Sequence, residues 1–80
     1  RVVLGKAREY LQKLLHEQGL EPGLVNELAA AYERLGYLES ESAAPEAALA
    51  SYNEAVRLRR QIVARRPGDA RAIEELAYAL

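Results

Sequence analysis

Residues capable of acid–base or nucleophilic chemistry are few in this chain. Its 80 residues include one histidine, His16, and no cysteine. Hydrolytic or transfer chemistry needs a nucleophile beside an oriented base, or paired carboxylates in a cleft. His16 stands next to Glu17 near the end of a predicted helix, where the helix dipole favours a charged, solvated histidine. The sequence therefore predicts a protein that is not an enzyme and uses no cofactor.

Three acidic residues in and just after the predicted connection between the second and third helices are candidates for holding a cation: Glu39, Glu41 and Glu46. Their segment lacks the glycine and the regular oxygen spacing of a calcium loop, so we expect a solvated acidic segment. The five glycines stand singly, at predicted helix ends, and form no phosphate-binding loop. The sequence therefore predicts neither a metal site nor a nucleotide site.

Positive charge is concentrated in the C-terminal third of the chain. Residues 55–80 carry six arginines against three acids, whereas residues 21–54 carry seven acids against one arginine. The six arginines lie on several helix faces with no aromatic residues between them, which argues against nucleic-acid binding. We expect them to pair with acids of a neighbouring helix. They are Arg57, Arg59, Arg60, Arg65, Arg66 and Arg71.

Four amphipathic helices carry these side chains. Half of the residues are apolar and all five aromatic residues are tyrosine, a composition typical of packed helices. Apolar residues recur at spacings of three and four, which predicts helices over residues 2–18, 22–36, 45–66 and 70–80. All four predicted elements are helices, so the predicted fold class is all-α. The connection between the first two helices is short, so we expect antiparallel helical hairpins.

Capping residues mark where these helices start and stop. Starts are predicted at Pro22, Pro45 and Asp69. Gly19 and Gly36 are predicted to end the first and second helices, which leaves residues 37–44 as one long loop.

No stretch approaches the roughly 20 apolar residues of a membrane span, so direct membrane insertion is not expected. Localisation stays open: cytoplasmic by default, although a larger parent protein could be membrane-anchored.

The helices repeat along the chain. A shift of 48 residues places Ala7 on Ala55 and brings Leu28 onto Leu76, so the first helix matches the third and the second matches the fourth. The unit is one helical hairpin. Residues 1–20 would then be the second helix of a preceding repeat, residues 21–68 one complete repeat, and residues 69–80 the start of the next.

Small and aromatic residues in this unit resemble the signature of the tetratricopeptide repeat (TPR). They are Val25, Leu28, Ala29, Tyr32, Gly36, Ala48, Tyr52, Ala55 and Pro67. The unit is longer than the roughly 34-residue pattern and resembles the long repeats attached to bacterial serine/threonine protein kinases. The resemblance implies a right-handed α-solenoid segment within a larger bacterial protein, in which Tyr32 and Tyr52 are mostly buried. The alternative is a four-helix bundle with no repeat history.

In that family the first helices of successive hairpins line a concave groove. By register, the groove positions here are Gly23, Asn26, Ala30, Glu33 and Arg34, followed by Arg71, Glu74 and Tyr78. The resemblance implies a protein-interaction scaffold that docks an extended or helical peptide there. Ala30 replaces the asparagine of the family's carboxylate-clamping arrangement, so chaperone C-terminal tails are not expected as ligands. The alternatives are that these residues are only solvated and that the segment is a structural spacer or oligomerisation element.

Apolar residues near both ends of the chain predict self-association. Val3, Leu11, Leu14 and Leu15 mark one side of the first helix, and the last helix stops at Leu80. Repeat arrays normally carry a polar cap at each end, and neither end here resembles one. We therefore expect a homodimer through the uncapped repeat ends.

Overall fold

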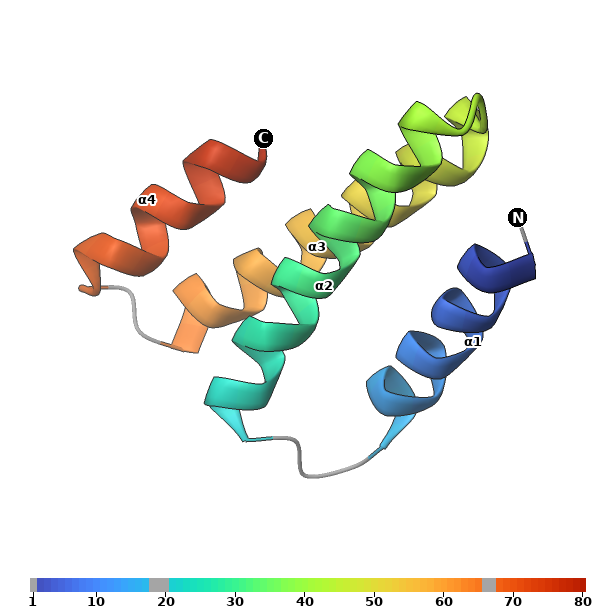
Figure 1. Cartoon of the computed structure of the whole chain (residues 1–80). Coiled ribbons are helices and arrows are strands. Elements are labelled where there is room, and N and C mark those ends of the chain that lie inside the picture. The colour runs from blue at the N-terminus through green and yellow to red at the C-terminus, as the bar shows by residue number, and fades with distance from the viewer. Residues whose placement is uncertain (1, 18–20, 66–67) are drawn as a thin grey trace.

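A computed structural model describes residues 2–17, 21–65 and 68–80 (Figure 1). It contains four helices, α1 (Val2–His16), α2 (Pro22–Glu41), α3 (Pro45–Arg65) and α4 (Ala70–Ala79), and no strand among the described residues. The predicted all-α class is therefore confirmed. The helix ends predicted at Gly19 and at residue 66 lie outside the described residues.

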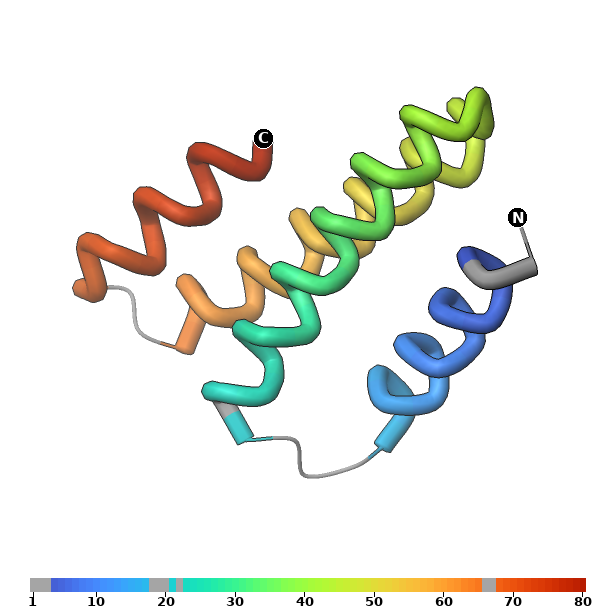
Figure 2. Tube along the Cα trace, in the orientation of Figure 1, coloured from blue at the N-terminus to red at the C-terminus, as the bar shows by residue number. Residues whose placement is uncertain are grey.

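The four helices are arranged around the antiparallel pair formed by α2 and α3. Helix α1 packs against α2, and α4 packs against α3, on opposite sides of this pair (Figure 2). The predicted packing of the second helix against both its neighbours is confirmed. The Cα trace measures 39 × 26 × 14 Å, so the fold is a flat slab in which every helix keeps a face at the surface.

The hydrophobic core lies between α2 and α3 and extends toward α1. Its buried members are Val25, Leu28, Ala29, Tyr32, Leu35, Ala55 and Leu58. Ala29 and Ala55 are completely buried, as expected where small side chains allow two helices to approach closely. Leucines of α1, including Leu11, Leu14 and Leu15, are half-buried against this core. These leucines of the predicted apolar side are thus engaged within the chain, whereas the side chain of Val3 lies outside what the structure describes.

Helix α2 continues past Gly36 to Glu41, so the predicted loop over residues 37–44 is wrong. Gly36 is buried inside the helix, and a Cβ atom placed on it would lie 3.1 Å from ring atoms of Tyr52. The glycine therefore serves a close approach between α2 and α3 and does not end the helix. Only residues 42–44 connect the two helices.

The end of α2 is a Schellman motif built on an alanine. The amide of Ala44 donates to the carbonyl of Glu39 at 2.9 Å, and the amide of Ala43 donates to that of Ser40 at 3.3 Å. Ala43 has a φ of 57°, in the left-handed region that usually favours glycine. Pro45 follows at once as the first residue of α3, as predicted.

A buried polar cluster fastens α1 to the hairpin. Ser51, completely buried, donates its hydroxyl hydrogen to Glu39 Oε1 at 2.6 Å. Arg8 Nη2 donates to Glu39 Oε2 at 2.6 Å, to Ser51 Oγ at 2.8 Å and to the carbonyl of Ala47 at 2.9 Å. The expectation that Glu39 belongs to a solvated acidic loop is therefore wrong, because Arg8 and Ser51 compensate its burial. Glu41 and Glu46 are exposed.

Candidate functional site

The surface between α2 and α4 has two hollows, described below, and we call the strip of surface that joins them the furrow. Arg59 lies beneath this furrow. It belongs to α3 and is only 6% exposed. Its Nη2 donates to Glu33 Oε1 at 3.1 Å and its Nε donates to Glu33 Oε2 at 3.3 Å. Its Nη1 donates to Asn26 Oδ1 and lies 3.6 Å from Glu75 Oε1 of α4. One arginine thus links three helices at the floor of the furrow.

The pairing of an α3 arginine with acids of neighbouring helices was predicted from charge, and Arg59 confirms it. Sequence reasoning did not single out Arg59 as the buried member of the six. A usable signal was that Asn26 and Glu33 stand seven residues apart on one face of α2, where a single long cation can reach both. In the structure these two groove positions bind Arg59.

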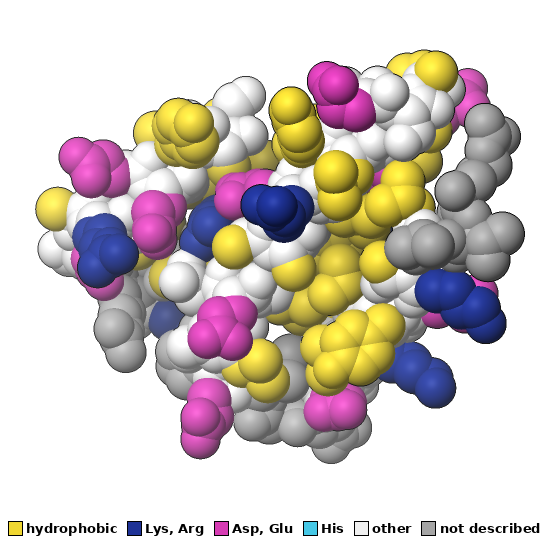
Figure 3. Space-filling view, viewed as in Figure 1, with side chains coloured by type: hydrophobic (Ala, Val, Ile, Leu, Met, Phe, Trp, Pro, Cys, Tyr) yellow, Lys and Arg dark blue, Asp and Glu magenta, His cyan; other side chains and the backbone are white. Residues whose placement is uncertain are grey.

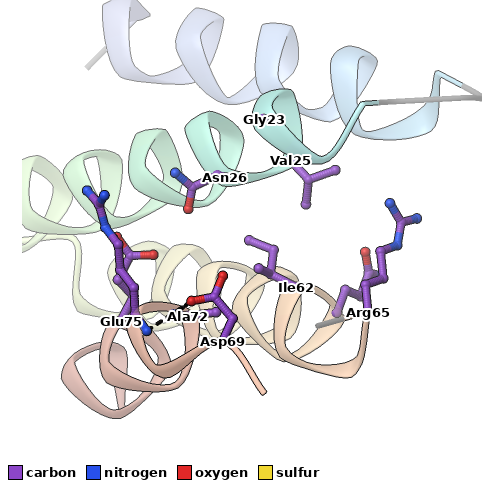
Figure 4. A pocket seen from close by; sticks show the side chains of 10 residues that line it. Gly23, Val25, Asn26, Ile62, Arg65, Asp69, Ala72 and Glu75 are labelled. Carbon is purple, nitrogen blue, oxygen red and sulfur yellow. Dashed lines mark hydrogen bonds and ion pairs between the residues drawn. The ribbon is translucent and has the colours of Figure 1, made fainter. Parts of the chain in front are cut away.

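A polar hollow of about 370 Å³ opens at one end of the furrow (Figure 4). Val25 and Asn26 of α2 lie across the hollow from Ile62 of α3. The N-terminus of α4 forms another wall, where Asp69 Oδ1 accepts hydrogen bonds from the amides of Arg71 at 3.0 Å and Ala72 at 3.2 Å. The predicted N-cap is therefore confirmed, and these two amides are already occupied. The lining residues are Gly23, Val25, Asn26, Gln61, Ile62, Arg65, Asp69, Arg71, Ala72 and Glu75.

A second hollow, of about 330 Å³, opens at the other end of the furrow. We call it the tyrosine hollow, because tyrosines of three helices line it: Tyr37 of α2, Tyr52 of α3 and Tyr78 of α4. Glu33, Arg34 and Ala79 complete its walls. Figure 3 shows dark blue side chains between α2 and α4 on this face, and they are arginines because the two lysines of the chain belong to α1. The hollow therefore combines aromatic walls with one acid and one arginine, Glu33 and Arg34.

A shallow third hollow adjoins the tyrosine hollow between α3 and α4. The two share Tyr52, Tyr78 and Ala79. The other lining residues are Leu49, Asn53, Val56, Arg57, Arg60 and Leu80. Leu49 is 62% exposed. Large apolar side chains thus reach the surface around the C-terminal half of α4.

The predicted groove positions separate into three groups. Gly23, Asn26 and Arg71 line the polar hollow, and Glu33, Arg34 and Tyr78 line the tyrosine hollow. Ala30 and Glu74 are exposed on α2 and α4 and line neither hollow. The groove prediction did not include Tyr37 and Tyr52, because one lay in a supposed loop and the other was expected to be mostly buried. Tyr52 is 36% exposed, so most of its surface is covered, and Tyr32 is 2% exposed.

Two titratable side chains away from the furrow are His16, at the end of α1, and Tyr32, in the core. His16 is exposed at the end of α1, with Nδ1 2.7 Å from the carbonyl oxygen of Gln12. Burial raises the pKa of the Tyr32 phenol, and the negative charge of Glu54 raises it further.

Among the described residues, no three histidine, aspartate or glutamate side chains are grouped so that they could hold a metal ion. Nor is any described helix long and apolar enough to cross a membrane.

Comparisons with protein-family models, with curated proteins and with solved structures find no match to this chain.

Proposed function

We propose that this chain is a non-enzymatic protein-interaction segment of the TPR type, which docks a peptide in the furrow between α2 and α4. The observation that carries the proposal is the Arg59 contact set. Through Glu33, Asn26 and Glu75 it holds the two helices on either side of a furrow that has a hollow at each end. A furrow with fixed walls binds a peptide without first having to order itself.

The packing order of the helices supports a repeat. Each outer helix makes most of its contacts with one member of the central hairpin, α1 with α2 and α4 with α3, which is the relation expected between successive hairpins in a stack. The sequence match at a shift of 48 residues supports the same reading. On the strength of the family resemblance, the parent protein would be a bacterial, kinase-linked signalling protein.

Peptide selection followed by mapping tests this function. A library of random short peptides, displayed on phage, would be selected on the chain, and a recovered peptide titrated into labelled protein while backbone amide shifts are recorded. We expect the shifts to change along α2 and α4 and at Arg59, and to remain constant along the outer face of α1. Failure to recover any binder, or a footprint confined to α1, would contradict the proposal.

An alternative function is a spacer or oligomerisation element, and the exposed apolar residues favour it. Ile73 and Leu80 of the α4 region are 46% and 74% exposed, and Leu49 on α3 is also exposed. Leu49 and Leu80 line one hollow, and an apolar surface of this kind can be covered by a second copy. Light scattering over a concentration series distinguishes the two: a dimer that is lost in Leu49→Ser and Leu80→Ser supports oligomerisation, whereas a monomer at the highest soluble concentration excludes it.

A further inference from the structure

Two of the three tyrosines of the tyrosine hollow are mostly exposed, and the third is partly exposed. Tyr37 and Tyr78 are 57% and 92% exposed, and Tyr52 is 36% exposed, whereas Tyr32 of the same hairpin is buried in the core. Exposed tyrosines are suited to contact a partner, because each offers a large rigid apolar face and a hydroxyl group at little entropic cost. Three of them from three helices face one hollow of about 330 Å³, which is large enough for a side chain but not for a folded element.

The wall formed by Tyr52 is held in place before any ligand arrives. Its ring lies against the backbone of Gly36, so closely that a Cβ atom there would be 3.1 Å from three ring atoms. The ring therefore cannot move toward α2. A preformed apolar wall is characteristic of small binding sites and lowers the entropic cost of binding.

The charges around the hollow leave a positive rim. Both carboxylate oxygens of Glu33 accept hydrogen bonds from Arg59, so this acid is already neutralised. Arg57, in the adjoining hollow, is likewise paired with Glu54. Arg34 in the tyrosine hollow and Arg60 in the adjoining one form no ion pair with any described residue.

This charge pattern selects between two ligands that aromatic walls can hold. Tyrosine faces attract quaternary ammonium groups through cation–π contacts. A rim that carries Arg34 and Arg60 repels such a cation and attracts carboxylates. The same faces can cover an apolar side chain, whose binding the rim does not oppose.

We infer that the tyrosine hollow receives an apolar side chain of an acidic peptide, with carboxylates of the peptide facing Arg34 and Arg60. This inference rests on the proposed docking function and specifies the ligand class for one end of the furrow. The peptide would lie in an extended form across α2 and α4, because neighbouring side chains of an extended chain can then reach the hollow and its rim separately.

The composition of the selected peptides tests the inference directly. Recovered sequences should combine aspartate or glutamate with leucine, phenylalanine, tyrosine or proline, and their affinity should fall with added salt. Tyr78→Ala and Arg34→Glu should each weaken binding roughly tenfold or more. The matched controls are Tyr10→Ala and Lys6→Glu on α1, which remove an exposed tyrosine and reverse an exposed charge away from the furrow. Both controls should bind as the parent chain does.

Three outcomes would overturn the inference. They are selected peptides that are basic, binding that Tyr78→Ala leaves intact, and displacement of a bound peptide by tetramethylammonium chloride but not by sodium chloride of equal ionic strength. A footprint at the polar hollow alone would refute the inference while leaving the docking function in place. Absence of any footprint along α2 and α4 would refute both.

Discussion

Arg59 and Glu33 form a two-point contact across 26 residues of sequence. Nη2 and Nε of the arginine each donate to a different carboxylate oxygen, at 3.1 and 3.3 Å. The Arg59 side chain is 8% exposed and that of Glu33 is 27% exposed, so the pair lies at the boundary between core and furrow. Because Asn26 and Glu75 share the same guanidinium group, this pair also links α2 to α4.

Removing the Arg59 guanidinium should destabilise the chain considerably. Arg59→Met keeps the apolar stem but leaves Glu33 and Asn26 without their shared donor, so we expect the free energy of unfolding to fall by about 2 to 4 kcal/mol. Urea denaturation measures this change. Arg60→Met, at an exposed neighbouring position, is the control and should change little. A loss below about 1 kcal/mol for Arg59→Met would show that the contact set does not hold the furrow together.

Gly36→Ala should not bring the stabilisation that alanine usually brings inside a helix. At Gly5 in α1 a Cβ atom meets nothing within 4 Å, so Gly5→Ala should raise the free energy of unfolding by about 0.5 to 1 kcal/mol. At Gly36 the new methyl group meets the Tyr52 ring, and we expect no gain or a loss of up to about 1 kcal/mol. Thermal denaturation compares the two variants. In a chain that already carries Tyr52→Ala, Gly36→Ala should raise the free energy of unfolding as Gly5→Ala does. An equal gain from Gly5→Ala and Gly36→Ala in the parent chain would contradict the close approach.

Ala43→Gly should stabilise the turn between α2 and α3. Ala43 adopts a φ of 57°, where a Cβ atom costs roughly 1 to 2 kcal/mol, and part of this is offset by the greater freedom of glycine in the unfolded chain. We expect a net gain of about 0.5 to 1 kcal/mol in urea denaturation. Ala50→Gly, on an exposed face of α3, should instead cost about 1 kcal/mol. Destabilisation by Ala43→Gly would mean that the Schellman motif is not formed.

Stability should decline in alkaline solution through Tyr32. Its pKa is raised in the folded chain above the ordinary value of 10.0, chiefly by burial, so folding favours the neutral phenol. The part of the free energy of unfolding that comes from keeping this phenol neutral is fully present below about pH 10 and is lost as the pH rises through the raised pKa. Unfolding midpoints measured on both sides of pH 10 should therefore fall less in Tyr32→Phe than in the parent chain. Tyr10→Phe, which removes an exposed phenol, should follow the parent, and identical profiles for all three chains would contradict the assignment.

Local signals in the sequence determined where the helices begin. Pro22, Pro45 and Asp69 stand at the starts of α2, α3 and α4 in the structure as in the prediction. Each acts within one helical turn, through a fixed φ angle or a carboxylate that accepts nearby amide hydrogens. The groove positions came from the family resemblance, and of these Arg34 and Tyr78 line the tyrosine hollow whereas Ala30 and Glu74 line neither hollow.

Where α2 ends was decided by tertiary structure. Gly36 has the residue type of a helix stop, but the ring of Tyr52 packs on it and the helix continues. The actual stop uses Ala43, a residue type that gives no signal for a left-handed conformation. The same extension carries Tyr37 to the tyrosine hollow, so that part of the candidate site could not be predicted until the packing of α3 was known.

Which charged side chains are buried was likewise decided only by the packed fold. In the sequence, Arg59 and Glu39 resemble the other charged residues of their helices, yet they are 6% and 4% exposed. A long charged side chain stays in water unless partners from other helices compensate its desolvation. Those partners, Glu33 for Arg59 and Arg8 for Glu39, are 26 and 31 residues away in the chain, and only the packing of the helices brings them within hydrogen-bonding distance.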